Sequence, residues 1–179
     1  MLRILKMVIA GCVVTGCAAP GQTAKLETEA IKKEVQAFKK EALTLFIKAD
    51  PELNRFESNS HTLFLCLYQL NDPNGFYQLA QEKNSLPKLM ECNRFDATVA
   101  NAKRFVVQPG QELKDVRDMA EGVRYIGIAT GYYGFGNEKV TELLPLTLPA
   151  GRMGKPPGNT GSIVQIELGP REISSVKVK

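Results

Sequence analysis

Cysteine is the residue type in this chain whose spacing most directly suggests chemistry. Two of the four cysteines, Cys12 and Cys17, lie in the apolar N-terminal segment MLRILKMVIAGCVVTGC, and each follows a glycine. The other two, Cys66 and Cys92, lie much further along the chain. Because a thiol can be modified covalently or can form a disulfide, the two pairs raise separate questions.

The N-terminal segment has the composition of a secretory signal. Arg3 and Lys6 give it a basic beginning, and residues 7–16 carry no charge. A membrane-spanning helix needs roughly 20 apolar residues, so this segment is too short to cross a bilayer. It does have the basic and hydrophobic regions of a signal peptide. We therefore expect it to direct export.

Two sites compete for cleavage of that signal. IAGC (9–12) and VTGC (14–17) both resemble the bacterial lipobox, in which signal peptidase cleaves before a cysteine that carries diacylglycerol. The first is the closer match, but cleavage before Cys12 leaves a hydrophobic region shorter than the roughly seven residues that a signal needs. We therefore predict that residues 1–16 are the signal peptide and that Cys17 becomes the acylated, diacylglycerol-bearing first residue.

Removal of the signal leaves an odd number of cysteines, namely Cys17, Cys66 and Cys92. Lipidation of Cys17 accounts for the odd one, since an exported protein with an unpaired cysteine needs a reason for it. A Cys66–Cys92 disulfide would persist in an oxidising compartment and would contribute on the order of 3 kcal/mol in the chain-entropy model. Cys66 also lies in the apolar run LFLCL, where it could be a buried side chain that never pairs. Both alternatives are open from the sequence.

Composition argues against several functional classes. The formal charge is +4, and it falls to +2 without the signal, which gives no electrostatic case for nucleic-acid binding. The single histidine, His61, and the absence of CxxC or HExxH motifs argue against a zinc site. GYYGFG (131–136) lacks the lysine of a phosphate-binding loop, and no GxSxG is present. We expect no catalytic residues, metal or cofactor beyond the lipid.

The residues that follow Cys17 predict a helical tether. From Gln22 to about Lys40 the chain is rich in Lys and Glu, with Ile31, Val35 and Phe38 at helical spacing. We interpret residues 17–41 as a lipidated N-terminus with a solvated tether. A helix that binds a partner or a membrane surface is the alternative.

From residue 42 to residue 179, short apolar runs separated by turn residues predict one all-β domain. The predicted strands are 42–48, 61–70, 102–108, 112–116, 123–133, 140–148, 162–168 and 172–178. Pro109-Gly110 suggests that the third and fourth strands pair as a hairpin. Residues 74–92 predict one or two short helices, and the Gly- and Pro-rich segment 150–161 predicts a mobile loop. Seven or eight strands favour a β-sandwich.

Several stretches of this domain resemble the TssJ family of type VI secretion lipoproteins. They are LTLFIKADPELN (43–54), LFLCLYQLNDPNGFYQL (63–79), FVVQPGQ (105–111) and VRYIGIATGYY (123–133) followed by LLPL. None is a catalytic fingerprint, so the resemblance depends on their order and on the lipobox. It implies a transthyretin-like sandwich with added helices, held at the periplasmic face of the outer membrane.

The resemblance also implies a partner. Members bind the periplasmic C-terminal domain of TssM, which with TssL completes a complex across the envelope, and the loop between the first two strands reaches TssM. Here that loop is 50–61, and we expect contacts from Asn54, Arg55, Phe56 and Glu57. Ala18 after the lipidated cysteine favours the outer membrane, because aspartate there is the usual signal for retention in the inner membrane.

Two other classes of protein remain as alternatives. A periplasmic lipoprotein that binds a small ligand or glycan would need a pocket with exposed aromatic side chains, and the chain has no Trp and only five Tyr. An enzyme of the envelope would need a clustered nucleophile or metal site, and the sequence contains no such pattern.

Overall fold

The computed structural model describes residues 38–134, 139–146 and 161–179. The predicted signal, the predicted lipidation site Cys17, most of the predicted tether and nearly all of the loop at 150–161 lie outside the described residues. No helix within the described ranges is long and apolar enough to cross a membrane.

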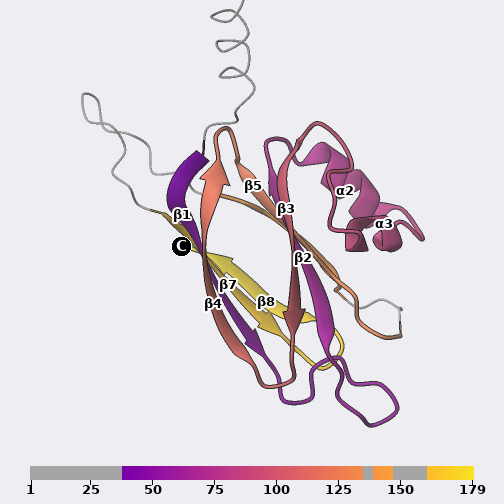
Figure 1. Ribbon diagram of the computed structural model, residues 1–179. Coiled ribbons are helices and arrows are strands. Elements are labelled where there is room, and N and C mark those ends of the chain that lie inside the picture. The colour runs from indigo at the N-terminus through magenta and orange to yellow at the C-terminus, as the bar shows by residue number, and fades with distance from the viewer. Residues whose placement is uncertain (1–37, 135–138, 147–160) are drawn as a thin grey trace, which may run out of the picture. The chain divides into compact units, whose positions relative to one another are not determined.

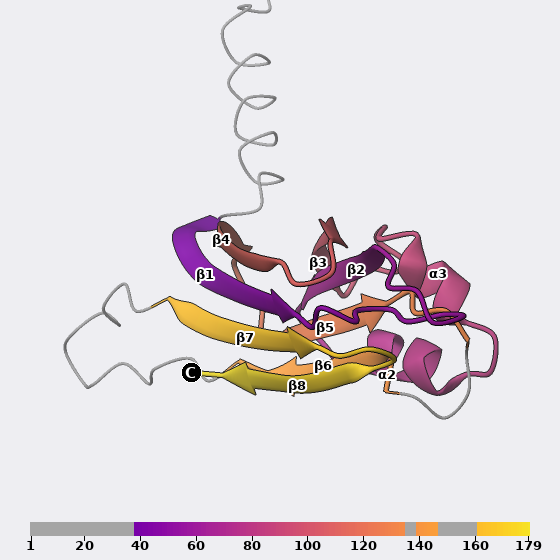
Figure 2. The same ribbon diagram turned by 90° about the horizontal axis from the view of Figure 1, so that it is seen from below.

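The described residues form eight strands in two sheets, with two short helices between the second and third strands (Figures 1 and 2). In chain order the elements are β1 (Phe38–Ala49), β2 (Leu63–Leu70), α2 (Asn74–Gln81), α3 (Leu86–Met90), β3 (Val99–Val107), β4 (Glu112–Ala120), β5 (Tyr125–Thr130), β6 (Thr141–Pro145), β7 (Ser162–Leu168) and β8 (Ile173–Val178). One sheet has the order β4-β1-β7-β8 and the other β3-β2-β5-β6. The predicted β-sandwich with inserted helices is therefore confirmed.

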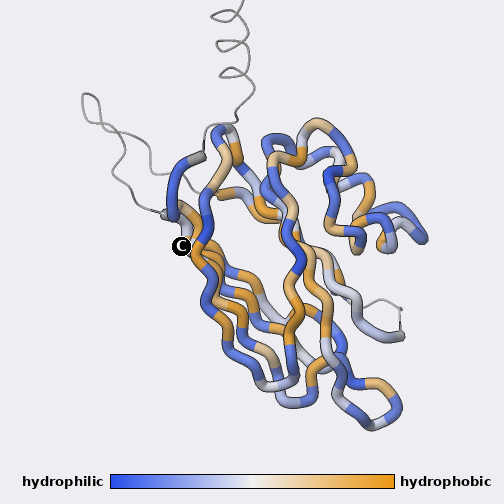
Figure 3. The backbone as a smooth tube through the Cα atoms, in the orientation of Figure 1, coloured by the Kyte–Doolittle hydropathy of each residue, from blue (hydrophilic) through white to orange (hydrophobic). Residues whose placement is uncertain are grey.

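The main core lies between the two sheets. Successive side chains of a strand point to opposite faces, and hydrophobic and hydrophilic residues alternate along several strands (Figure 3). On β1 the predicted set Leu43, Leu45 and Ile47 is fully buried. Leu65 and Leu67 of β2 belong to the same cluster. Strand β1 is central, because it pairs antiparallel with β4 and parallel with β7.

A second core lies between the outer face of the β3-β2-β5-β6 sheet and the two helices. Strand β2 is apolar on both faces, and its other set of side chains, including Tyr68, belongs to this cluster together with Phe76 of α2 and Leu89 of α3. Gly127 of β5 permits the close packing, because a Cβ there would lie 2.7 Å from the ring of Phe76. The helices thus cover a sheet face that would otherwise expose apolar residues.

The predicted hairpin between the third and fourth strands is wrong. Strand β3 pairs with β2, whereas β4 pairs with β1 in the other sheet. The turn at Pro109-Gly110 does reverse the chain, with Gly110 at a φ of +70°, a conformation that glycine adopts without strain. Its backbone binds the end of β1, since Gly110 N–H donates to Asp50 O at 3.0 Å. This contact lies where the chain passes from one sheet to the other.

The boundary of the predicted tether also needs correction. Strand β1 begins at Phe38, so residues 38–40 are extended and do not end a helix. The helical spacing that includes Phe38 misplaced this boundary. A register shift between Lys39 and Leu43 marks where β1 changes its pairing with β4, which is the signature of an irregularity such as a β-bulge.

Candidate partner-binding site and disulfide

The loop between β1 and β2 has a defined backbone structure. Leu53 is fully buried and accepts a hydrogen bond from His61 N–H at 3.0 Å. At its tip, Phe56 and Asn59 exchange two backbone hydrogen bonds of 2.9 Å. The two residues between them, Glu57 and Ser58, both have positive φ, as the central residues of a type I′ turn do. The loop therefore presents its tip in a fixed geometry.

Asn54 holds this loop to the rest of the domain and is not a surface contact. Its side chain is only 1% exposed. The amide nitrogen donates to Thr62 O at 3.0 Å, and the amide oxygen accepts from Tyr133 N–H at 2.8 Å. Asn54 also has a φ of +53°, which asparagine tolerates better than most residues. Its burial argues against the contact predicted for this residue and assigns it a positioning role.

The neighbours of Asn54 are exposed. Phe56 is 44% exposed, and its ring centroid lies 5.5 Å from that of Tyr133, which is 54% exposed. His61 packs edge-on against the same tyrosine at 5.1 Å. Arg55 forms an exposed ion pair with Glu52 at 3.0 Å. Together with Glu57, these side chains form an aromatic and charged surface at the loop.

An open hollow lies at this surface, lined by Arg55, Phe56, Glu57, Ser58, Tyr133, Gly134 and Arg171. Its lining residues come from three segments, namely the loop after β1, the residues that follow β5 and the turn between β7 and β8. Three of its residues, Arg55, Phe56 and Glu57, were predicted as contacts. Tyr133 and Arg171 were not, because their proximity depends on the topology of the sandwich.

Tyr132 fixes the position of Tyr133. Its side chain is buried, and its hydroxyl donates to Glu172 O at 2.9 Å. Burial raises the pKa of Tyr132 well above its ordinary value, and the nearby Glu172 carboxylate adds to this effect. The hydroxyl therefore stays protonated and keeps its hydrogen bond. Because Tyr132 points inward, the adjacent Tyr133 side chain is directed to the surface.

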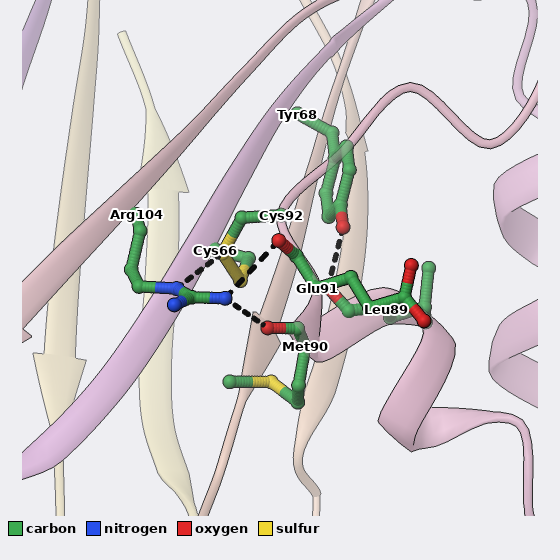
Figure 4. The surroundings of a disulfide bond; sticks show 7 residues. All are labelled: Cys66, Tyr68, Leu89, Met90, Glu91, Cys92 and Arg104. Atoms are coloured by element: carbon green, nitrogen blue, oxygen red, sulfur yellow. Dashed lines mark hydrogen bonds between the residues drawn. A yellow bond between two sulfur atoms is a disulfide. The ribbon is translucent and has the colours of Figure 1, made fainter.

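Cys66 of β2 and Cys92, just after α3, form a disulfide with a Cα–Cα distance of 5.3 Å (Figure 4). Arg104 of β3 lies beside it and donates to the carbonyls of Met90 at 2.8 Å and Glu91 at 3.1 Å. A cation is favourable at the carbonyl-rich C-terminal end of a helix. The disulfide and Arg104 both tie the end of α3 to the sheet.

Tyr68 provides a third tie at the same place. Its hydroxyl donates to Leu89 O of α3 (Figure 4). Burial raises the pKa of Tyr68 to about 12, so the hydroxyl remains a donor at neutral pH.

Within the described part of the chain, no group of three or more His, Cys, Asp or Glu side chains could hold a metal ion.

Comparison with solved structures gives similar folds. A crystal structure of the type VI lipoprotein TssJ1 from Pseudomonas aeruginosa has a TM-score of 0.60 and 19% identity, covering 76% of this chain and 95% of that one. Serratia marcescens Lip, a membrane-bound component of the type VI secretion system, has a TM-score of 0.56 and 18% identity, with coverage of 75% and 96%.

A third similar chain comes from a structure described as the type VI secretion protein TssM C-terminal domain (869-1107) from EAEC. Its TM-score is 0.52 and its identity 16%, with coverage of 76% of this chain and 96% of that one.

No curated protein matches the sequence significantly. The family described as type VI secretion lipoprotein, with the names VasD, EvfM and TssJ, matches residues 41–169, which is most of the chain. The protein therefore belongs to this type VI secretion lipoprotein family.

Proposed function

We propose that this lipoprotein anchors a type VI secretion complex to the outer membrane by binding the periplasmic C-terminal domain of TssM, and through it TssL. Family membership supports a role in type VI secretion. The description of one similar structure names the TssM C-terminal domain, which favours TssM as the partner. The main observation in favour of this binding site is the loop after β1, at whose tip the exposed ring of Phe56 packs against that of Tyr133.

The chemistry of this surface fits a protein partner. Aromatic and arginine side chains are enriched among the residues that contribute most to protein interfaces. Here Phe56, Tyr133 and two arginines, Arg55 and Arg171, surround one open hollow. Because Asn54 and Tyr132 hold the surrounding backbone, little conformational entropy is lost on binding, which favours affinity.

The membrane side of the function depends on Cys17, which we propose as the lipidated residue. Stable anchoring requires more than one acyl chain, because each buried CH₂ contributes only about 0.8 kcal/mol. Diacylglycerol on the thiol and an acyl chain on the new amino terminus meet this requirement. The protein then transmits load from the lipid anchor to TssM without catalysing a reaction.

Replacement of Arg55 and Phe56 by alanine tests the binding site. We expect binding of the detergent-solubilised lipoprotein to immobilised TssM periplasmic domain from the same system to weaken by about tenfold or more. Biolayer interferometry measures this affinity. Tyr77→Ala is the matched control, because Tyr77 is an exposed aromatic residue on α2 and should bind like the parent protein. Absence of binding by the parent protein would refute the proposed function.

A further inference from the structure

Part of the outer face of the β3-β2-β5-β6 sheet is left uncovered by the helices. The helices lie beside one end of this sheet and the loop after β1 beside the other (Figure 1). Phe64 at the start of β2 is 49% exposed, and Val106 of β3 is 50% exposed. The two residues are direct cross-strand partners, so their side chains lie side by side on the same face.

This apolar pair continues toward the candidate partner-binding loop. Gly131 N–H donates to Phe64 O at 3.0 Å, and Tyr133 follows two residues later. His61, which packs on Tyr133 at 5.1 Å, precedes Phe64 by three residues. We call Val106, Phe64, Tyr133 and Phe56 the apolar band. They are four of the seven exposed large hydrophobic side chains among the described residues, and such clustering marks interaction surfaces.

Positive charge borders the apolar band at both ends. The guanidinium of Arg104 lies 5.9 Å from the centroid of the Phe64 ring and donates to backbone carbonyls. Arg171 lines the hollow beside Phe56 and Tyr133. Neither arginine takes part in the four ion pairs of the described residues. A partner segment with apolar side chains and flanking carboxylates would complement both features.

We propose that the partner's docking surface extends from the loop along the whole apolar band, onto the outer face of β2 and β3. The occupant is a second segment of the same partner domain, with apolar side chains on Phe64 and Val106 and carboxylates near Arg104. This inference rests on the proposed function, because continuity with the loop identifies the occupant.

The test compares two double variants on opposite sheets. Phe64→Ser with Val106→Ser removes the middle of the apolar band. Phe46→Ser with Val116→Ser is the matched control, because these residues are 37% and 48% exposed and lie on strands β1 and β4. We expect affinity for the TssM periplasmic domain to fall by about tenfold or more in the first variant and to be unchanged in the second.

A second test compares two substitutions of opposite charge at one exposed position. Because both replace the same side chain by a charged one, a difference in affinity between them reports charge and not loss of folding. Val106→Glu should weaken binding more than Val106→Lys, because a carboxylate would repel the expected carboxylates of the occupant. Equal effects of the two substitutions would contradict the proposed charge complementarity.

The remaining outcomes separate this inference from the proposed function. One outcome is that the Arg55 and Phe56 variant binds TssM more weakly while the Phe64 and Val106 variant binds it like the parent protein. This result would overturn the inference and leave the proposed function standing. No binding by the parent protein would remove both. A loss of self-association in sedimentation, without a change in TssM affinity, would show that a second copy occupies the band and would also overturn the inference.

Discussion

At the scale of single residues, Asn54 has the clearest effect on the candidate site although it is buried. We expect Asn54→Ala to lower the free energy of unfolding by about 2 kcal/mol, because Thr62 O and Tyr133 N–H lose their partner and unsatisfied buried polar groups cost roughly 1–3 kcal/mol. TssM affinity should also fall, since the loop loses its connection to Tyr133. Urea unfolding and binding measurements together check both effects.

Asn59→Ala is the control for this prediction. Asn59 lies in the same loop, but its side-chain hydrogen bond to Glu57 O, at 3.3 Å, is exposed, so we expect little change in stability. An Asn54→Ala protein with the stability and affinity of the parent would show that the buried amide does not position the loop.

The sequence located part of the surface that we propose as the binding site, for identifiable reasons. Arg55 and Phe56 are residue types favoured at interfaces, and the loop after the first strand could be located from the pattern. The role of Asn54 could not be seen, because its partner Tyr133 lies 79 residues away. Asparagine tolerates a left-handed backbone better than most residues, and this was the one hint in the sequence. The backbone angle itself cannot be read from a single sequence.

At the scale of elements, the periodicity of the sequence predicted the strands better than their pairing. Alternating burial depends on local sequence, so Leu43, Leu45 and Ile47 were placed correctly. Pairing depends on which sheet a turn leads to. A Pro-Gly turn indicates reversal of the chain, but it does not indicate that β4 joins the sheet of β1, where Gly110 N–H donates to Asp50 O. The parallel pairing of β1 with β7 likewise has no local signal.

The disulfide gives a prediction about how α3 is attached to β2. Cys66→Ala with Cys92→Ala should lower the free energy of unfolding by about 3 to 4 kcal/mol, because the bond links residues 26 apart and restricts the unfolded chain. Urea unfolding measures this loss. Hydrogen exchange should increase most in α2 and α3, where the local tie is lost.

A reductant provides the control for the disulfide. Dithiothreitol should destabilise the parent protein and leave the double variant unaffected. Intact mass spectrometry of the exported protein should show a mass two hydrogen atoms below that of the reduced form. Free thiols at both Cys66 and Cys92 would contradict the bond.

At the scale of the whole molecule, the proposed function requires the β-sandwich and the lipid anchor to act in series. In this proposal the domain carries the surface for TssM, and the anchor resists the force applied through it. Neither part suffices, since a sandwich without lipid is not held at the membrane and a lipid without the loop has no partner. The predicted anchor lies outside the described residues, so we test it by lipid labelling and cell fractionation.

We expect Cys17→Ala to abolish incorporation of labelled palmitate and to remove the protein from the outer-membrane fraction. Loss of the acyl chains removes roughly 0.8 kcal/mol of membrane affinity per CH₂. Cys12→Ala should retain labelling, because this residue is removed with the signal. If Cys12→Ala abolishes labelling and Cys17→Ala does not, cleavage occurs at the earlier site. In that case the local motif, and not the length of the hydrophobic region, determines which cysteine carries the lipid.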